Sequence, residues 1–376
     1  MNISPFKLEE YFARYEFTSP YVLCASDCET VSIGELLSLG GGQQESLTDL
    51  RLGYTETFGN LQLREQIAAL YEEISASQVL VHCGGEEPIF NFINSTLQPG
   101  DHIVVHWPAY QSLFEVARAS GVEVTMWETN EKNSWELDVN FLKDHIRSNT
   151  KVVIVNSPHN PTGYLLTRET QQEIDQLSRE FGFIVFSDEI YRFSEYRLDD
   201  RLTPWCDLNE NAVSLGGMSK AFGLPGLRIG WIATRNRDVY ERMASFKNYT
   251  TICNSAPSEF LATVALRNKD TIVNRNVQII SANLEQLNRF FRRYEHIFNW
   301  RIPKAGPIAF PSLRSGEDTS KFCHELVTQA GILLLPGSIY GLPRSSNFRI
   351  GFGRKNLPTC LGKLEQFLDV MEKSSY

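Results

Sequence analysis

Between residues 79 and 235 the sequence alternates short apolar runs with amphipathic stretches of helical periodicity. The apolar runs lie at 79–82, 103–105, 122–126, 152–155, 183–186, 212–215 and 229–233. Nearly continuous apolar strands that are separated by helices are typical of a mostly parallel sheet with helices on both faces. Such sheets bind their ligands beyond the carboxyl ends of the strands. The sequence therefore predicts an α/β fold whose functional residues lie in the loops after these strands.

The two ends of the chain have a different character. Residues 1–48 read as a helix followed by an irregular arm that ends at three glycines, residues 40–42. A helix is expected at 61–73, and after Pro257 further helices at 261–266, 270–294 and 357–372, with short strands at 308–310, 332–335 and 348–350. We therefore expect a large domain over 49–260 and a smaller α+β domain over 261–376, to which the segment 1–48 contributes.

Composition limits the classes of function. Of the 376 residues, 42% are hydrophobic and 22% are charged, which is typical of a globular protein with a full core. The formal net charge of -9 argues against broad binding to nucleic acid or to an anionic membrane. No apolar run approaches the length of a membrane span, and no Gly-x-x-x-x-Gly-Lys-Ser/Thr nucleotide loop is present. The expected ligands are therefore small molecules.

The cysteines and histidines indicate neither a disulfide framework nor a metal site. The seven cysteines form no Cys-x-x-Cys pair, and the N-terminus lacks the basic and apolar pattern of a secretory signal. We therefore expect a cytoplasmic protein with reduced thiols. His102 and His106 are four residues apart, but the apolar residues between them indicate a strand, which would hold the rings apart. We expect no metal.

A glycine-rich segment at 214–231 has the clearest chemical content. It contains Lys220 and, eight residues later, Arg228, which is followed by the apolar run 229–233. Glycines in such a segment allow close backbone approaches that a Cβ would obstruct. An amine and a guanidinium presented together suit a small anionic ligand, such as a phosphate-bearing aldehyde held by the lysine. Taken alone, the segment would also suit a surface loop with an ordinary lysine.

Other segments occur in a set order around this lysine. They are Tyr-Thr-Glu-Thr-Phe-Gly at 54–59, Asn-Pro-Thr-Gly at 160–163, Asp-Glu-Ile-Tyr at 188–191 and Asn-Phe-Arg-Ile-Gly at 347–351. In this order, the sequence closely resembles the pyridoxal-phosphate (PLP) aminotransferases of class I/II, which have the aspartate-aminotransferase-like architecture called fold type I. The resemblance covers most of the chain. It implies pyridoxal 5'-phosphate as the cofactor and a homodimer as the assembly.

The resemblance implies a role for each matching residue around the cofactor ring. Lys220 would hold the cofactor through an imine and then move the proton between the substrate Cα and the cofactor. Asp188 would pair with the pyridine nitrogen and keep it protonated. Tyr191 and Asn160 would bind the phenolic oxygen, and Tyr110 would stack on the ring.

The resemblance also implies a phosphate site that departs from the usual pattern. Ser219 and Arg228 would bind the phosphate, together with the backbone of Gly85 and Glu86 where a helix is expected to begin. The family often has a small or hydroxyl residue at the position of Glu86, so only its main chain would contribute. Gly217 replaces a serine that often binds the phosphate as well. The phosphate site would therefore have one hydroxyl group fewer than is usual.

Two more residues would complete the site from distant parts of the sequence. Tyr54 would cross a dimer interface and reach the phosphate in the active site of the partner subunit. Arg349 would bind the α-carboxylate of the substrate with both arms of its guanidinium, beside Asn160. A strand arginine near the C-terminus is otherwise usually a surface charge.

The expected reaction is transfer of the α-amino group of an amino acid to a 2-oxo acid. Because the same residues serve other chemistry at Cα, the alternative is a PLP-dependent lyase or cyclase of this fold, similar to capreomycidine-synthase-like members. A PLP-binding regulator is a third option, but it would usually need a DNA-binding segment, for which there is no room before Tyr54. The choice of amino acid stays open and would depend on the arm at 25–29, the loop at 305–309 and the partner subunit.

Overall fold

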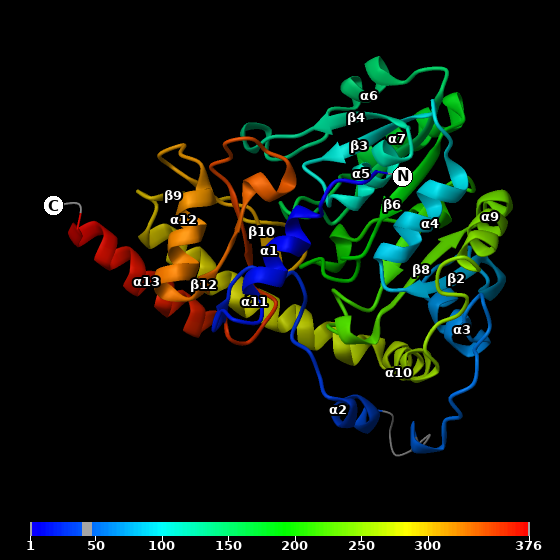
Figure 1. The fold of residues 1–376 in the computed structure, drawn as a ribbon, viewed down its shortest axis with the longest axis horizontal. Coiled ribbons are helices and arrows are strands. Elements are labelled where there is room, and N and C mark those ends of the chain that lie inside the picture. Colours follow the sequence, from blue (N-terminus) through cyan, green and yellow to red (C-terminus); the bar gives the residue numbers. More distant parts are fainter. Residues whose placement is uncertain (1, 40–46, 375–376) are drawn as a thin grey trace.

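The computed structural model describes residues 2–39 and 47–374, and a seven-stranded sheet lies at its centre (Figure 1). The strand order is β2-β8-β7-β6-β5-β3-β4, with β2 (Val79–Cys83), β3 (His102–Trp107), β4 (Glu123–Glu128), β5 (Thr150–Asn156), β6 (Ile184–Asp188), β7 (Val213–Gly217) and β8 (Ile229–Thr234). The adjacent strands β4, β3, β5, β6 and β7 are parallel to one another, whereas β8 is antiparallel to both β7 and β2. The predicted α/β fold with a mostly parallel sheet is confirmed.

Helices cover both faces of this sheet, because strand side chains alternate between the two faces. Ile103 and Val105 of β3 pack with α4 (Glu86–Thr96), α5 (Ser112–Ala119) and α9 (Arg237–Lys247). Val104, between them, packs with α6 (Val139–His145) and α7 (Arg168–Phe181) on the other face. Near β2 and β8 the packing continues through α3 (Leu61–Ala68) and α10 (Ala256–Arg267). The loops at the strand ends are thus left to build a site.

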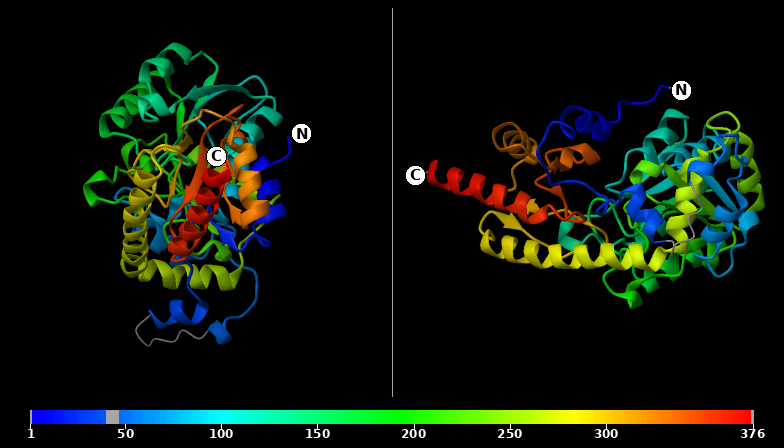
Figure 2. Two further views of the ribbon diagram at one scale, coloured as in Figure 1. Left: turned by 90° about the vertical axis from the view of Figure 1, so that its left-hand side faces the viewer. Right: turned by 90° about the horizontal axis from the view of Figure 1, so that it is seen from below.

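A long helix, α11 (Lys269–Arg293), leads from α10 to the C-terminal elements (Figures 1 and 2). These elements contain a small sheet of order β10-β14-β13, with β10 (Ile308–Ala309), β13 (Leu335–Pro336) and β14 (Phe348–Gly351). They also contain the antiparallel pair β9 (Phe298–Asn299) and β11 (Ser312–Leu313), and the helices α12 (Thr319–Glu325) and α13 (Leu357–Ser374). Strands, helices and a separate apolar cluster give this part the predicted α+β character.

The N-terminal segment packs on these C-terminal elements. Strand β1 (Tyr21–Val22) pairs in parallel with β12 (Ile332–Leu333), and α1 (Lys7–Tyr15) lies between the C-terminal elements and the central sheet (Figure 1). The expected irregular arm includes a further helix, α2 (Ile33–Ser38), which begins with a capping box between Ser32 and Glu35. The glycines at 40–42 lie outside the described residues. The domain limits at 48 and 260 remain predictions.

One helix is shorter than the sequence predicts. Helix α3 ends at Ala68 rather than at residue 73. The backbone N–H groups of Glu72 and Glu73 instead donate to the carboxylate of Asp207, each at 2.9 Å. This tertiary contact replaces the helical hydrogen bonds, and the local periodicity contained no sign of it. Within the described ranges, no helix combines the length and the apolar character that crossing a membrane requires.

Candidate active site

The loops after the strands meet α1 and the arm around one cavity of about 480 Å³. Ten residues that the sequence predicts for the site line this cavity: Gly85, Glu86, Tyr110, Asn160, Asp188, Tyr191, Ser219, Lys220, Arg228 and Arg349. They are brought together from positions that span most of the chain. Tyr54 does not line the cavity, and 93% of its surface is exposed.

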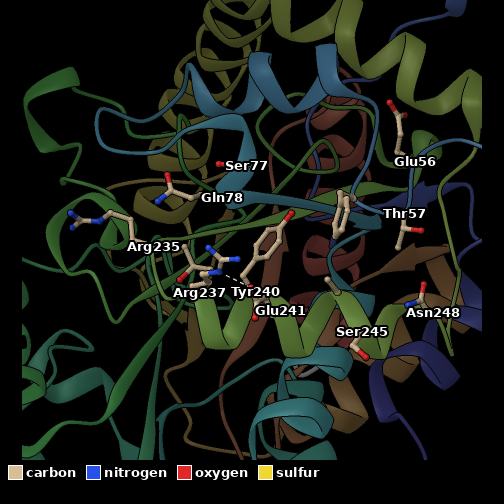
Figure 3. A pocket seen from close by; sticks show the side chains of 13 residues that line it. Glu56, Thr57, Ser77, Gln78, Arg235, Arg237, Tyr240, Glu241, Ser245 and Asn248 are labelled. Carbon is tan, nitrogen blue, oxygen red and sulfur yellow. Dashed lines mark hydrogen bonds and ion pairs between the residues drawn. The ribbon is translucent and has the colours of Figure 1, made fainter.

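A second cavity, of about 950 Å³, is larger but chemically less suitable (Figure 3). It is lined by the segment 56–58, by Ser77 and Gln78 before β2, and by residues from the end of β8 and from α9. Arg237 and Glu241 of α9 form an ion pair at its edge. No residue predicted for the site lines it. The smaller cavity is therefore the candidate active site.

Lys220 follows β7 and points its amine at the N-terminal arm. Its Nζ donates a hydrogen bond to the Oγ of Ser26 at 2.8 Å and lies 5.9 Å from the centre of the Tyr191 ring. Burial lowers the pKa of Lys220 to about 8, because the charged ammonium is poorly solvated there. About a tenth of the amine is therefore neutral at pH 7, far more than for a lysine with the ordinary pKa of about 10.5. A neutral amine can act as a nucleophile or as a base.

Ser26, which no sequence motif marks as a site residue, is held in place by its neighbours in the arm. Asp27 accepts two hydrogen bonds from the guanidinium of Arg354, both at 2.9 Å, and the N–H of Glu29 donates to the carbonyl of Gly353 at 2.9 Å. A Cβ on Gly351 would lie 1.9 Å from the carbonyl oxygen of Ala25, so the arm can approach β14 only beside a glycine. These contacts fix the hydroxyl beside the lysine.

Asp188 ends β6 and is a buried carboxyl group at the base of the cavity. Its Oδ1 accepts a hydrogen bond from the N–H of Ile190 at 3.1 Å. Burial raises the pKa of Asp188 to about 6, since the carboxylate loses its hydration. A cationic N–H group in the cavity would reverse this effect by pairing with the carboxylate. The environment thus suits a ligand with a protonated ring nitrogen.

Asn160 and Arg349 belong to one buried hydrogen-bond network with Tyr340, which the sequence analysis also missed. The Nη1 of Arg349 donates to the Tyr340 hydroxyl at 2.7 Å and to the Oδ1 of Asn160 at 3.1 Å. The Tyr340 hydroxyl donates to the same Oδ1 at 3.1 Å. Because two donors bind its oxygen, Asn160 keeps its Nδ2 group for another acceptor. The guanidinium itself is anchored by the carbonyl oxygen of Cys24, at 2.9 Å from Nη2.

The start of α4 and Arg228 form a positively polarised end of the cavity. Gly85 is the N-cap residue of α4, so backbone N–H groups at this helix start have no helical partner. Gly84 has a φ of 76°, and a Cβ on it would lie 2.3 Å from the Nη2 of Arg228. The guanidinium therefore rests directly against the backbone before the helix. Ser219, which is buried, lines the same cavity.

The structure shows the surroundings of Glu86 and Gly217, the two residues that depart from the usual phosphate site of the family. The Glu86 carboxylate accepts a hydrogen bond from Ser112 at 3.2 Å, and burial raises the pKa of Glu86 to about 7. A Cβ on Gly217 would lie 2.7 Å from the Cδ1 of Ile190, so a serine there would require Ile190 to move. Ile190 also lines the cavity and thus fills the space beside the missing hydroxyl.

Comparison with known proteins places this geometry in a family. The family model "Aminotransferase class I and II" matches residues 41–358. Capreomycidine synthase from Streptomyces vinaceus is 27% identical over 92% of this chain and 88% of its own, and aspartate aminotransferase from Thermotoga maritima is 28% identical over 85% and 82%. The crystal structure of a PLP-dependent aminotransferase from Streptococcus suis superimposes with a TM-score of 0.92 at 28% identity, and the match covers 98% of both chains.

The cofactor is pyridoxal phosphate, and the residues in the cavity fit its three functional groups. An amine with a lowered pKa, that of Lys220, suits the aldehyde. A helix N-terminus beside Arg228 suits the phosphate, and the buried carboxyl group of Asp188 suits the ring nitrogen. From its sequence, its fold and this site, the chain belongs to the class I and II aminotransferase family.

Proposed function

We propose that the protein is an aminotransferase that moves the α-amino group of an amino acid to a 2-oxo acid. The observation that carries this proposal is the amine of Lys220, whose pKa is lowered to about 8 and which lines one cavity with Asp188 and Arg349. When bound, the cofactor supplies an electron-accepting ring that stabilises the negative charge left when a bond at the substrate Cα breaks.

In this proposal, Lys220 first binds the cofactor at its aldehyde carbon, C4′. Once the substrate amine took its place there, the neutral amine of Lys220 would move the proton between the substrate Cα and C4′. Asp188 pairs with the ring nitrogen and keeps it protonated, so that the ring can accept electrons. Ser26, whose Oγ accepts from the lysine Nζ at 2.8 Å, restrains the direction in which the amine points.

Other residues position the two ligands. Arg349 binds the α-carboxylate, since its guanidinium is buried and bonded only to neutral groups among the described residues. Asn160 and Tyr191 bind the phenolic oxygen of the cofactor, and Tyr110 packs on its ring. Arg228, Ser219 and the start of α4 at Gly85 and Glu86 bind the phosphate.

The visible absorbance of the cofactor-loaded protein tests this reaction. We expect one amino acid from a panel to abolish the absorbance of the lysine-bound cofactor, and a 2-oxo acid to restore it. Lys220→Ala should abolish both changes, because the proton transfer loses its base; losses of about 10²–10⁴-fold are typical for such groups. Return of the starting absorbance after the amino acid has been added, without any 2-oxo acid, would contradict transamination.

The second candidate function is a PLP-dependent cyclase or lyase. The similarity to capreomycidine synthase, which extends over 92% of this chain, favours it. The same Lys220 would then remove the proton at Cα, but the substrate would lose or replace a group on its side chain while the nitrogen stayed in place. The absorbance test separates the two reactions, because only transamination requires the 2-oxo acid.

We further propose a homodimer in which Tyr54 contributes to the partner's active site. Tyr54 and Leu52 are 93% and 81% exposed, and Tyr249 is 88% exposed. The two segments are connected, since the Thr55 hydroxyl donates to the carbonyl oxygen of Asn254 at 3.1 Å. Exposed aromatic and aliphatic residues on joined segments are typical of a surface covered by another protein chain.

A further inference from the structure

Helix α1 and its C-cap residue present a stripe of three side chains to the active-site cavity, which we call the α1 stripe: Glu9, Phe12 and the C-cap residue Glu16. Their spacing of three and four residues places them on one face of the helix. The helix is fixed in this orientation by the buried Leu8, by a hydrogen bond from the Lys7 N–H to Gln111 at 3.0 Å, and by one from the Tyr11 hydroxyl to Leu334 at 3.2 Å. The stripe is therefore part of the cavity wall.

No salt bridge joins the described residues of the α1 stripe to the catalytic groups; Glu9 acts on Lys220, and Arg354 on Glu16, only through attraction at longer range. With the cofactor bound, Asp188 faces its ring nitrogen and Arg228 its phosphate. Arg354 is neutralised by Asp27 through two hydrogen bonds of 2.9 Å. Glu9 accepts a hydrogen bond from the Tyr110 hydroxyl at 3.3 Å, and neither Glu9 nor Glu16 forms a salt bridge with another described residue.

The buried guanidinium of Arg349 gives a second, independent indication of the ligand's orientation. It is 1% exposed and has no carboxylate partner in the described part of the chain, so an anionic ligand suits it. Its Cζ lies 6.0 Å from the centre of the Phe12 ring. The α-carboxylate of a substrate would bind at Arg349 and its amine would lie at Lys220. The side chain of such a substrate would therefore start next to the α1 stripe.

We propose that the substrate is an L-amino acid whose side chain ends in a cation, either a guanidinium or an ammonium group. The aliphatic part of the side chain contacts Phe12, and the cation lies between the carboxylates of Glu9 and Glu16. Partial burial raises the pKa of Glu16, so its carboxylate gains from a cationic partner. This assignment rests on the proposed binding of an amino acid at Lys220 and Arg349, but not on which reaction follows.

Pairs of amino acids with the same shape and different charge test the proposal. Cofactor-loaded Lys220→Ala protein binds amino acids without turnover, so a titration of its visible absorbance gives dissociation constants. We expect L-arginine to bind about tenfold more tightly than the neutral L-citrulline, and L-lysine more tightly than L-norleucine. Equal dissociation constants within each pair would overturn the proposal.

Variants of the stripe decide whether these carboxylates cause the preference. In the same background, Glu9→Gln together with Glu16→Gln should reduce the ratio of arginine to citrulline affinity to about one, because both negative charges are lost. The matched control is Glu10→Gln, an exposed residue of the same helix that does not line the cavity, and it should leave the ratio unchanged. An unchanged ratio in the double variant would overturn the assignment.

The binding experiment tests the preference for cationic side chains independently of the proposed reaction. Binding constants in the Lys220→Ala background do not depend on transamination, so a preference for cations would stand even if no 2-oxo acid were aminated. Conversely, amination of a 2-oxo acid by neutral amino acids alone, with equal binding within each pair, would leave the proposed reaction intact and overturn this inference only.

Discussion

At the scale of single residues, the contact between Lys220 and Ser26 joins two distant parts of the sequence. The 2.8 Å hydrogen bond joins the amine to a serine that lies 194 positions earlier in the sequence. Ser26 occupies no recognisable motif, and only the folded arm places it beside the lysine. The hydroxyl accepts a hydrogen bond from the amine, which favours the protonated form of the lysine.

The pH dependence of cofactor uptake measures this environment. Because burial lowers the pKa of Lys220 to about 8, the neutral amine is scarce below that pH and dominant above it. The rate at which apo-protein gains visible absorbance with PLP should rise about tenfold per pH unit up to about pH 8 and then level off. A rate that continues to rise toward pH 10 would contradict a lowered pKa.

Ser26→Ala should shift the midpoint of this profile to lower pH, since the variant loses a hydrogen bond that stabilises the ammonium. The matched control is Ser281→Ala, an exposed serine of α11 that bonds only to the carbonyl of Val277. It should leave the profile unchanged. A midpoint that moves upward in Ser26→Ala would contradict the role given to the hydroxyl.

Individual residues also show where sequence reasoning reaches its limit. Lys220, Asp188, Asn160 and Arg349 could be predicted because ordered motifs mark them, and the structure brings them to one cavity. Ser26 could not be predicted, since its position depends on how the arm packs against Gly351 and Gly353. The absence of a serine at 217 was visible in the sequence, but its relation to Ile190 is a packing effect that only the structure shows.

At the scale of elements, the start of α4 and the loop before β8 together form the end of the cavity that we propose for the phosphate. The Gly84 backbone and the Arg228 guanidinium are so close that a methyl group cannot fit between them. Arg228 itself has a φ of 52° and a ψ of 48°, a left-handed conformation at the end of the short 3₁₀ helix Pro225–Leu227. Because of this close contact, the backbone position at the start of α4 limits where the Arg228 guanidinium can lie.

Gly84→Ala should weaken PLP binding about tenfold, because the added Cβ displaces the Arg228 guanidinium from the phosphate end. Gly182→Ala is the matched control, since Gly182 has a similar φ of 74° but no atom within 4 Å of a Cβ. Both variants should lose about 1 kcal/mol of unfolding free energy from the left-handed conformation. Equal PLP dissociation constants for the two variants would contradict the proposed phosphate site.

The extent of the elements was predictable where local patterns dominate. The long helix α11 lies at its predicted position, to within one residue at each end, because long amphipathic periodicity determines it. The end of α3 was predicted wrongly, since the contact of Asp207 with the N–H groups of Glu72 and Glu73 is formed only by the folded chain. Helix α2 was missed because six residues are too few for a clear periodicity.

At the scale of the whole molecule, the role proposed for Tyr54 depends on a second subunit. Tyr54 is a predicted phosphate ligand, yet it is 93% exposed and lies outside the cavity of its own chain. A homodimer would let it reach the other cavity. Each active site would then contain residues of both chains, which makes complementation between two inactive variants a direct test.

Mixing Lys220→Ala protein with Tyr54→Ala protein, followed by subunit exchange, should restore activity. Each mixed dimer has one site with a native lysine from one chain and a native tyrosine from the other, so random exchange should give about a quarter of the wild-type rate. The rate of amino transfer in the exchanged mixture measures this, with the unmixed variants as controls. Activity no higher than the mean of the two unmixed variants would contradict a shared site.

The central claim is that this pocket transfers an amino group, and the most direct test follows the nitrogen atom. The wild-type protein, loaded with PLP, is supplied with an α-¹⁵N-labelled amino acid and an unlabelled 2-oxo acid, and mass spectrometry locates the label. The account predicts ¹⁵N in the new amino acid made from the 2-oxo acid, and no such transfer by Lys220→Ala. Label that stays in a cyclised product or leaves as ammonia, with the 2-oxo acid unchanged, would contradict it.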